Sequence, residues 1–121
     1  MICAGDILYV YCIFIDPPHY KYAVCICPEY PLFFFINSEP RRSTADAQIL
    51  IKKSDFPFLT YDSYINTATV VTFRQRELNE AEKKGRLTSQ LKKRIIDVVK
   101  NHKYLPPRHT QLVFDNLQND D

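Results

Sequence analysis

The chain has 121 residues, of which 45% are hydrophobic and 13% aromatic, so it can fill one core and we expect a single domain over residues 1–121 rather than a disordered chain. Its formal net charge of +2 is unevenly distributed, because residues 83–108 hold nine basic residues and one acidic residue, while the remainder is net acidic. A basic C-terminal third favours an acidic partner, either nucleic acid or an acidic protein, although a solvated helix face explains the same charges.

Three strands are predicted in the first forty residues. Residues 7–15 and 20–27 are rich in β-branched, aromatic and apolar side chains. The tandem prolines between them cannot donate hydrogen bonds to a sheet, so these two runs predict a β-hairpin with a stiff turn. A second proline-containing turn leads to residues 32–36, whose almost wholly apolar sequence predicts a buried third strand.

Two further strands are expected after a polar loop at residues 39–44. In the first, residues 47–53, Ile49 and Ile51 lie on one face because side chains alternate along a strand. In the second, residues 64–73, β-branched and aromatic side chains occupy every second position. The sequence therefore predicts about five strands before the C-terminal region.

Helical periodicity replaces the strand pattern near residue 77. Residues 77–84 predict a short helix with acids at its start, lysines at its end and a glycine directly after it. Apolar residues then recur at helical spacing to about Lys103, with Thr88 or Ser89 as the N-cap. Because two prolines stop that helix, residues 110–114 predict either a last short strand or a docked tail.

Together these elements predict a mainly β fold. We expect a small, strongly bent sheet or SH3-like barrel of about five to six strands with a C-terminal α-helix. No apolar run approaches the roughly 20 residues of a membrane span, and no segment resembles a signal peptide, so a cytoplasmic protein without membrane contact is expected.

The four cysteines lie in apolar, strand-like surroundings and predict reduced, buried thiols. Cys25 and Cys27 share a strand face, but no second group of Cys or His follows at ligand spacing. We therefore expect neither a metal site nor another cofactor.

Five short segments, in this order and spacing, resemble the MazF/PemK-type toxins. They are GDI (5–7), YAVCI (22–26), FINS (35–38), DSYINT (62–67) and GRLT (85–88). Members of this family are small barrels and ribosome-independent endoribonucleases. The resemblance implies a homodimer that cleaves single-stranded RNA without a metal ion and that binds an acidic antitoxin protein.

The resemblance also implies catalytic residues. The toxins carry an Arg-Pro pair at the start of the second strand, where this chain has Lys21 and Tyr22. Lys21 would stabilise charge on the scissile phosphate, as a point charge rather than a bidentate clamp. Ser43 and Thr44 match the toxins' essential hydroxyl residue, and Thr44 would bond the phosphate or orient the ribose 2′-OH.

Three nearby residues complete the predicted site. His19 has a side chain suited to acid-base chemistry near neutral pH and would protonate the leaving 5′-oxygen. Arg41 and Arg42, next to Ser43, would hold flanking phosphates. Simpler interpretations are an exposed histidine at the hairpin tip, an ordinary strand lysine at Lys21 and a solvated polar turn.

The departures from the toxin pattern favour a second hypothesis, a non-catalytic barrel of toxin-like fold. In that interpretation a basic surface binds an acidic protein or nucleic acid, and its residues are Lys93, Arg94, Lys100 and Lys103. A third hypothesis is an accessory protein of a phage or mobile element.

Overall fold

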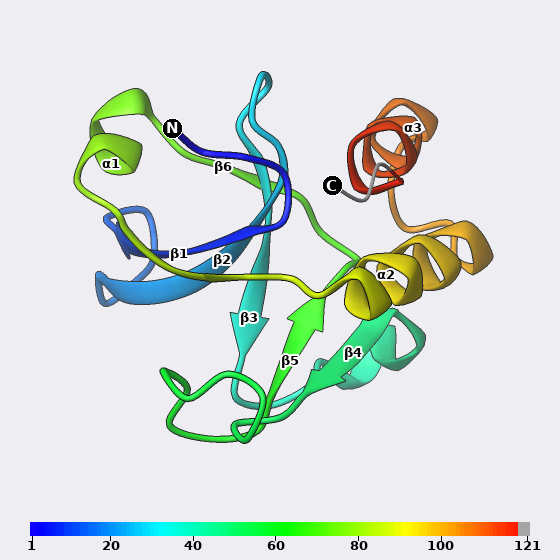
Figure 1. Ribbon diagram of the computed structural model, residues 1–121, viewed down its shortest axis with the longest axis horizontal. Coiled ribbons are helices and arrows are strands. Elements are labelled where there is room, and N and C mark those ends of the chain that lie inside the picture. Colours follow the sequence, from blue (N-terminus) through cyan, green and yellow to red (C-terminus); the bar gives the residue numbers. More distant parts are fainter. Residues whose placement is uncertain (119–121) are drawn as a thin grey trace.

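The computed structural model describes residues 1–118 and has one open, strongly curled antiparallel sheet flanked by helices (Figure 1). Its seven strands are β1 (Asp6–Cys12), β2 (His19–Cys27), β3 (Leu32–Asn37), β4 (Gln48–Ile51), β5 (Ser63–Asn66), β6 (Val71–Thr72) and β7 (Glu82–Arg86). The strand order is β4-β5-β3-β2-β1-β7, and β6 pairs with β3 outside this path. The expected mainly β class is confirmed, with one more strand than predicted.

The helices are α1 (Gln75–Asn79), α2 (Ser89–Asn101) and α3 (Pro107–Leu117), and a 3-10 helix, η1 (Arg42–Ala47), precedes β4. The predicted N-cap of α2 is confirmed, because the Thr88 hydroxyl accepts a hydrogen bond from the Leu91 N–H at 3.1 Å.

The prediction for residues 110–114 is wrong, because they belong to helix α3. Pro107 occupies the first turn of that helix, where a missing N–H costs nothing and the fixed φ of proline suits helical backbone. The proline pair therefore ends one helix and begins the next.

The helix expected over residues 77–84 is also wrong in its second half. Helix α1 ends at Asn79, and β7 pairs with β1 in the register Tyr9 to Glu82 and Ile7 to Gly85. Pairing with a strand edge outweighs the helical propensity of this charged segment. The strand expected over residues 64–73 is divided into β5 and β6 by a turn at Thr67, whose N–H and hydroxyl both donate to the Ala47 carbonyl.

Two hydrophobic clusters lie on opposite faces of the sheet. On β2, Val24 and Ile26 point to one face, which α2 and α3 cover with residues such as Ile95 and Val113. Ala23 and Cys25 point to the other face, which α1 covers. Figure 1 shows α1 and the α2–α3 pair on opposite sides of the strands.

Most apolar residues of β3 and β5 pack into these two cores. Phe33, Phe34, Ile36 and Ile65 are at most 5% exposed. These four buried residues cannot supply the interface of the expected homodimer.

All four cysteines are free thiols, as expected, and three of them are buried. Burial raises the pKa of Cys12 to about 11 and that of Cys25 to about 12, which keeps both as unreactive thiols. Within residues 1–118, no helix combines the length and the apolar character that crossing a membrane requires.

Candidate functional site

A pocket of about 250 Å³ opens where β3 ends, next to β5 and β6. Its lining residues are Phe35, Asn37, Arg41, Asn66, Thr69 and Val71. Sheet register explains the grouping. Tyr22 pairs with Ile36 and Ile36 pairs with Ile65, so Lys21 lies opposite Asn37 and Asn66 lies opposite Phe35. Opposite residues of antiparallel strands share a face, and this places all four side chains together.

Lys21 does not itself line this pocket, but it contacts two residues that do, Asn37 and Phe35, and we call the cavity the Lys21 pocket. The Lys21 ammonium donates a hydrogen bond to Asn37 Oδ1 and lies 4.5 Å from the centroid of the Phe35 ring. Burial lowers the pKa of Lys21 below its ordinary value, and the positive charge of Arg41 acts in the same direction.

The positive charge of the Lys21 pocket is not neutralised. Within the part of the chain that the structure describes, neither Lys21 nor Arg41 forms an ion pair with a carboxylate. Two cations that share a polar pocket without a counter-charge favour an anionic ligand.

A chain of amide hydrogen bonds connects the pocket to η1. Asn66 is 5% exposed, and its Oδ1 accepts hydrogen bonds from Gln48 Nε2 at 2.8 Å and from the Ala68 N–H at 3.1 Å. Gln48 Nε2 also lies 3.2 Å from Thr44 Oγ1. The Thr44 hydroxyl therefore reaches the pocket only through Gln48 and Asn66.

The structure brings together some of the residues predicted from the sequence and separates others. Lys21 and Arg41 lie at the pocket, with Thr44 behind it. Arg42 and Ser43 are exposed on η1. His19 lies two residues from Lys21 on β2, but its exposed imidazole donates from Nδ1 to the Pro17 carbonyl at 2.7 Å, in the hairpin turn.

Two pocket residues, Asn37 and Asn66, were missed by the sequence analysis, although they lie within the FINS and DSYINT segments. The signal was present. Each is the polar last residue of a strand that is otherwise apolar or alternating, and a side chain at a strand end can lie outside the core and line a pocket.

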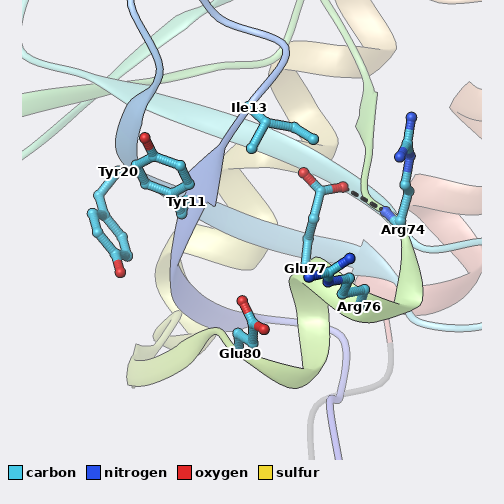
Figure 2. Close-up of a pocket in the computed structure, with 7 residues that line it drawn as sticks. All are labelled: Tyr11, Ile13, Tyr20, Arg74, Arg76, Glu77 and Glu80. Carbon is cyan, nitrogen blue, oxygen red and sulfur yellow. Dashed lines mark hydrogen bonds between the residues drawn. The ribbon is translucent and has the colours of Figure 1, made fainter.

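A second cavity, of about 300 Å³, lies between the β1–β2 hairpin and α1 and is shown in Figure 2. Its lining residues are Tyr11, Ile13, Tyr20, Arg74, Arg76, Glu77 and Glu80. Glu77 Oε1 accepts a hydrogen bond from the Arg74 N–H at 2.8 Å and so fixes the start of α1. None of the predicted catalytic residues lines this cavity.

A row of aromatic rings leads from that cavity along the hairpin, and we call it the tyrosine row. Ring centroids are 5.1 Å apart for Tyr11 and Tyr20, 4.8 Å for Tyr20 and Tyr9, 4.6 Å for Tyr9 and Tyr22, and 5.1 Å for Tyr22 and Phe58. Tyr11 is 43% exposed and Tyr20 is 51% exposed. The outer end of the row therefore offers ring surface to a ligand.

Six of the nine basic residues in the C-terminal third form two distinct groups. Lys93, Arg94, Lys100 and Lys103 are exposed on and just after α2, as a binding surface requires. Lys83 and Arg86 instead neutralise a buried carboxylate: the Asp6 oxygens lie 3.0 Å from Lys83 Nζ and 3.5 Å from Arg86 Nη1. We call this group the Asp6 cluster.

Lys92 is buried beside Gly5, which has a φ of +92°. The backbone conformation favours glycine at this position, and a Cβ there would also lie 2.9 Å from Lys92 Cε, so the end of the lysine side chain would have to shift.

Comparison with known proteins adds no family. The chain matches no protein-family model, and no curated protein matches it significantly.

Proposed function

We propose that the protein is a divergent endoribonuclease of the MazF/PemK type, which cleaves single-stranded RNA without a metal ion at the Lys21 pocket. The observation that carries the proposal is a pair of cations at a polar pocket, Arg41 in its lining and Lys21 against the lining residues Asn37 and Phe35, neither of which has a carboxylate partner among the described residues. A phosphodiester supplies the missing negative charge.

In the proposed reaction, the ribose 2′-oxygen attacks the adjacent phosphorus and the bond to the 5′-oxygen breaks. The products are a 2′,3′-cyclic phosphate and a 5′-hydroxyl end. The 2′-OH loses its proton as it attacks, and the leaving oxygen gains one. Lys21 and Arg41 stabilise the additional negative charge of the pentacoordinate phosphorus, and the partial burial of Lys21 strengthens its electric field there.

His19 and Thr44 take supporting roles in this scheme. His19 is exposed and can protonate the 5′-oxygen once its imidazole leaves the Pro17 carbonyl. Thr44 acts indirectly, because its hydroxyl accepts a hydrogen bond from Gln48, which in turn holds Asn66 at the pocket where the ribose is oriented. Arg42 and Ser43, exposed on η1, contact phosphates on either side of the cleaved bond.

The tyrosine row serves the same substrate by stacking its bases. Tyr20 belongs to the row and is the direct chain neighbour of Lys21. Because consecutive strand residues point to opposite faces, an RNA strand that passes around the start of β2 meets both.

The test is incubation of the purified protein with a long single-stranded RNA between pH 6 and 9, with and without a chelator. Lys21→Ala and Thr44→Ala should each lower the cleavage rate by about 10²- to 10³-fold, and His19→Ala by roughly 10²-fold. Lys53→Ala, at an exposed lysine whose side chain has no partner among the described residues, is the control. RNA that stays intact with the wild-type protein would refute the enzyme.

A non-catalytic RNA-binding or protein-binding barrel is the second candidate. It is favoured by the existing bonds of the proposed catalytic groups, since Lys21 binds Asn37, the Thr44 hydroxyl accepts from Gln48 and His19 binds Pro17. In this case the exposed basic residues of α2 should bind RNA or an acidic protein without cleavage.

The proposal includes a cytoplasmic homodimer with an acidic antitoxin protein as partner. A twofold interface needs a self-complementary surface of standard size, so light scattering at roughly tens of micromolar should report a dimer. A monomer at that concentration would contradict this part of the proposal and leave the chemistry of the pocket untouched.

A further inference from the structure

Asn66 presents a buried side chain with an unused hydrogen-bond donor. An asparagine amide has one acceptor oxygen and two N–H donors. The Asn66 oxygen already accepts from Gln48 and Ala68, whereas its Nδ2 bonds to no residue among 1–118. The side chain lines the Lys21 pocket, and its unpartnered Nδ2 is not completely buried. The free N–H groups of this 95% buried residue therefore face the pocket.

Lys21 fixes the Asn37 amide in a similar way, with the oxygen engaged and the nitrogen free. Its Oδ1 accepts the hydrogen bond from the Lys21 ammonium, so its Nδ2 is turned away from that contact and bonds to no described residue. Asn37 and Asn66 thus use their acceptor oxygens inside the protein and present only donors to the pocket.

The remaining lining matches these two amides. Arg41 lines the pocket, and Lys21 contacts its lining residues Asn37 and Phe35; both cations are donors without an acceptor. Phe35 and Val71 form its apolar part, and the Thr69 side chain can donate or accept. A cation would meet like charge here, and a ligand that must donate hydrogen bonds would find both amide oxygens engaged and the Thr69 hydroxyl as the one lining side chain able to accept.

We propose that the Lys21 pocket is a phosphoryl-binding site in which Asn37 and Asn66 are ligands, alongside Lys21 and Arg41. A phosphoryl group has several acceptor oxygens and no donor when ionised, and therefore complements a site of donors. This inference deepens the proposed function by naming the groups that hold the phosphate, but phosphate binding does not require that RNA is cleaved.

The phosphoryl group has two sources, the backbone of a single strand or a free phosphate ion. Titration of the ¹⁵N-labelled protein with inorganic phosphate, and separately with a single-stranded DNA oligonucleotide that lacks the attacking 2′-OH, distinguishes them. We expect both ligands to shift the side-chain amide signals of Asn37 and Asn66, and to compete with each other. Shifts with phosphate alone would identify a site for the free ion and would still support the proposal.

Asn66→Asp is the decisive variant, because it keeps the acceptor oxygen for Gln48 and Ala68 and replaces the donor by a negative oxygen. Phosphate affinity should fall by more than roughly tenfold. Asn79→Asp is the matched control, since the Asn79 oxygen also accepts an amide hydrogen bond but lies outside the pocket on exposed α1.

Asn37→Asp provides an independent test at a position that is only half buried, in case Asn66→Asp does not fold. A carboxylate there would pair with Lys21 and should abolish phosphate binding. The proposal is wrong if millimolar phosphate leaves both wild-type amide signals unmoved, or if either folded variant binds phosphate as wild type does. Phosphate binding by a wild-type protein that leaves RNA intact would refute the nuclease and retain the site.

Discussion

The Asp6 cluster and the Lys21 pocket each contain one lysine and one arginine, but only the first contains a carboxylate. Asp6 is fully buried and lies between Lys83 and Arg86, and it also accepts the Cys3 N–H at 2.8 Å. Lys21 has an asparagine oxygen and an aromatic ring as neighbours instead, and Arg41 forms no ion pair within residues 1–118. The lysine and the arginine of the Asp6 cluster are therefore neutralised by a carboxylate of the same chain, whereas those of the Lys21 pocket have no counter-charge among the described residues.

We infer from this difference that the paired charges of the Asp6 cluster stabilise the fold, whereas the unpaired charges of the Lys21 pocket are available to bind a ligand. Removing one partner of a buried ion pair leaves the other uncompensated, which destabilises the folded state. Lys21 already bears a desolvation cost without a counter-charge, as the direction of its pKa change indicates. We expect substitutions in the Asp6 cluster to affect stability, and those in the Lys21 pocket to affect ligand binding.

The largest effect should follow from giving the Lys21 pocket its own carboxylate. Arg41→Glu places a negative charge next to Lys21, so RNA cleavage should fall by about 10²- to 10³-fold while the unfolding free energy changes little, because Arg41 is exposed. Cleavage rates and urea denaturation measure the two quantities. Lys53→Glu controls for the change in net charge, and equal losses in both variants would contradict a local role of Arg41.

Asp6→Asn should produce the opposite result. We expect a loss of about 3 kcal/mol in the free energy of unfolding, near the lower limit for breaking a buried ion pair because Lys83 and Arg86 are half exposed and can rehydrate. Asp97→Asn, on the exposed face of α2, is the control in the same denaturation series. A cost below that of the control variant would mean that the Asp6 cluster does not stabilise the fold.

Salt dependence compares the two sites in one measurement. Each phosphate contact contributes roughly 0.7 to the slope of log affinity against log salt for a single strand, so Lys21→Met should reduce the slope by about that amount. Lys83→Met should leave it unchanged, because Lys83 is already paired with Asp6. Reversing the charges of Lys93, Arg94 and Lys100 should flatten the slope further if α2 also contacts RNA.

The smallest effect concerns His102, a buried group whose hydrogen-bond partners are neutral and whose pKa decrease on burial is partly opposed by the Asp46 carboxylate. Its Nδ1 accepts the Tyr104 N–H at 3.2 Å, and its Nε2 lies 3.0 Å from the Thr67 hydroxyl. Burial lowers the pKa of His102 below its ordinary value of 6.5, so the unfolded chain binds the proton more tightly. The unfolding free energy should therefore be constant above about pH 6.5 and fall as the pH decreases below it.

Denaturation curves at several pH values will measure this dependence. His102→Gln should remove most of the decrease below pH 6.5, whereas His109→Gln should keep it. A wild-type stability that does not change between pH 7 and 5 would contradict the assignment to His102.

The elements governed by local patterns could be predicted from the sequence. The β1–β2 hairpin follows from two apolar runs around a proline turn, and α2 follows from its periodicity and its Thr88 cap. The strand β7 was missed because five charged and small residues have no strand pattern of their own, and only the exposed edge of β1 makes them a strand.

The candidate site was predicted only in part for a similar reason. Lys21 was found through the resemblance to a toxin motif, and Arg41 because it is a basic residue close to Ser43 and Thr44. Asn66 joins them through the pairing of β3 with β5, which brings residues from distant parts of the sequence onto one face. No local sequence pattern specifies that strand register. The hydrogen bonds that Gln48 and Ala68 donate to the Asn66 oxygen are likewise visible only in the three-dimensional structure.

The charged sequence of β7 also has a consequence for how copies of this protein behave at high concentration. β7 is an end strand of an open sheet, and its residues are Glu82, Lys83, Lys84, Gly85 and Arg86. A strand at a sheet end has one row of backbone groups available for pairing, and a second molecule could extend the sheet there. Lysines at such a position oppose that growth by repulsion. The segment that was hardest to recognise as a strand therefore also opposes aggregation at its own end of the sheet.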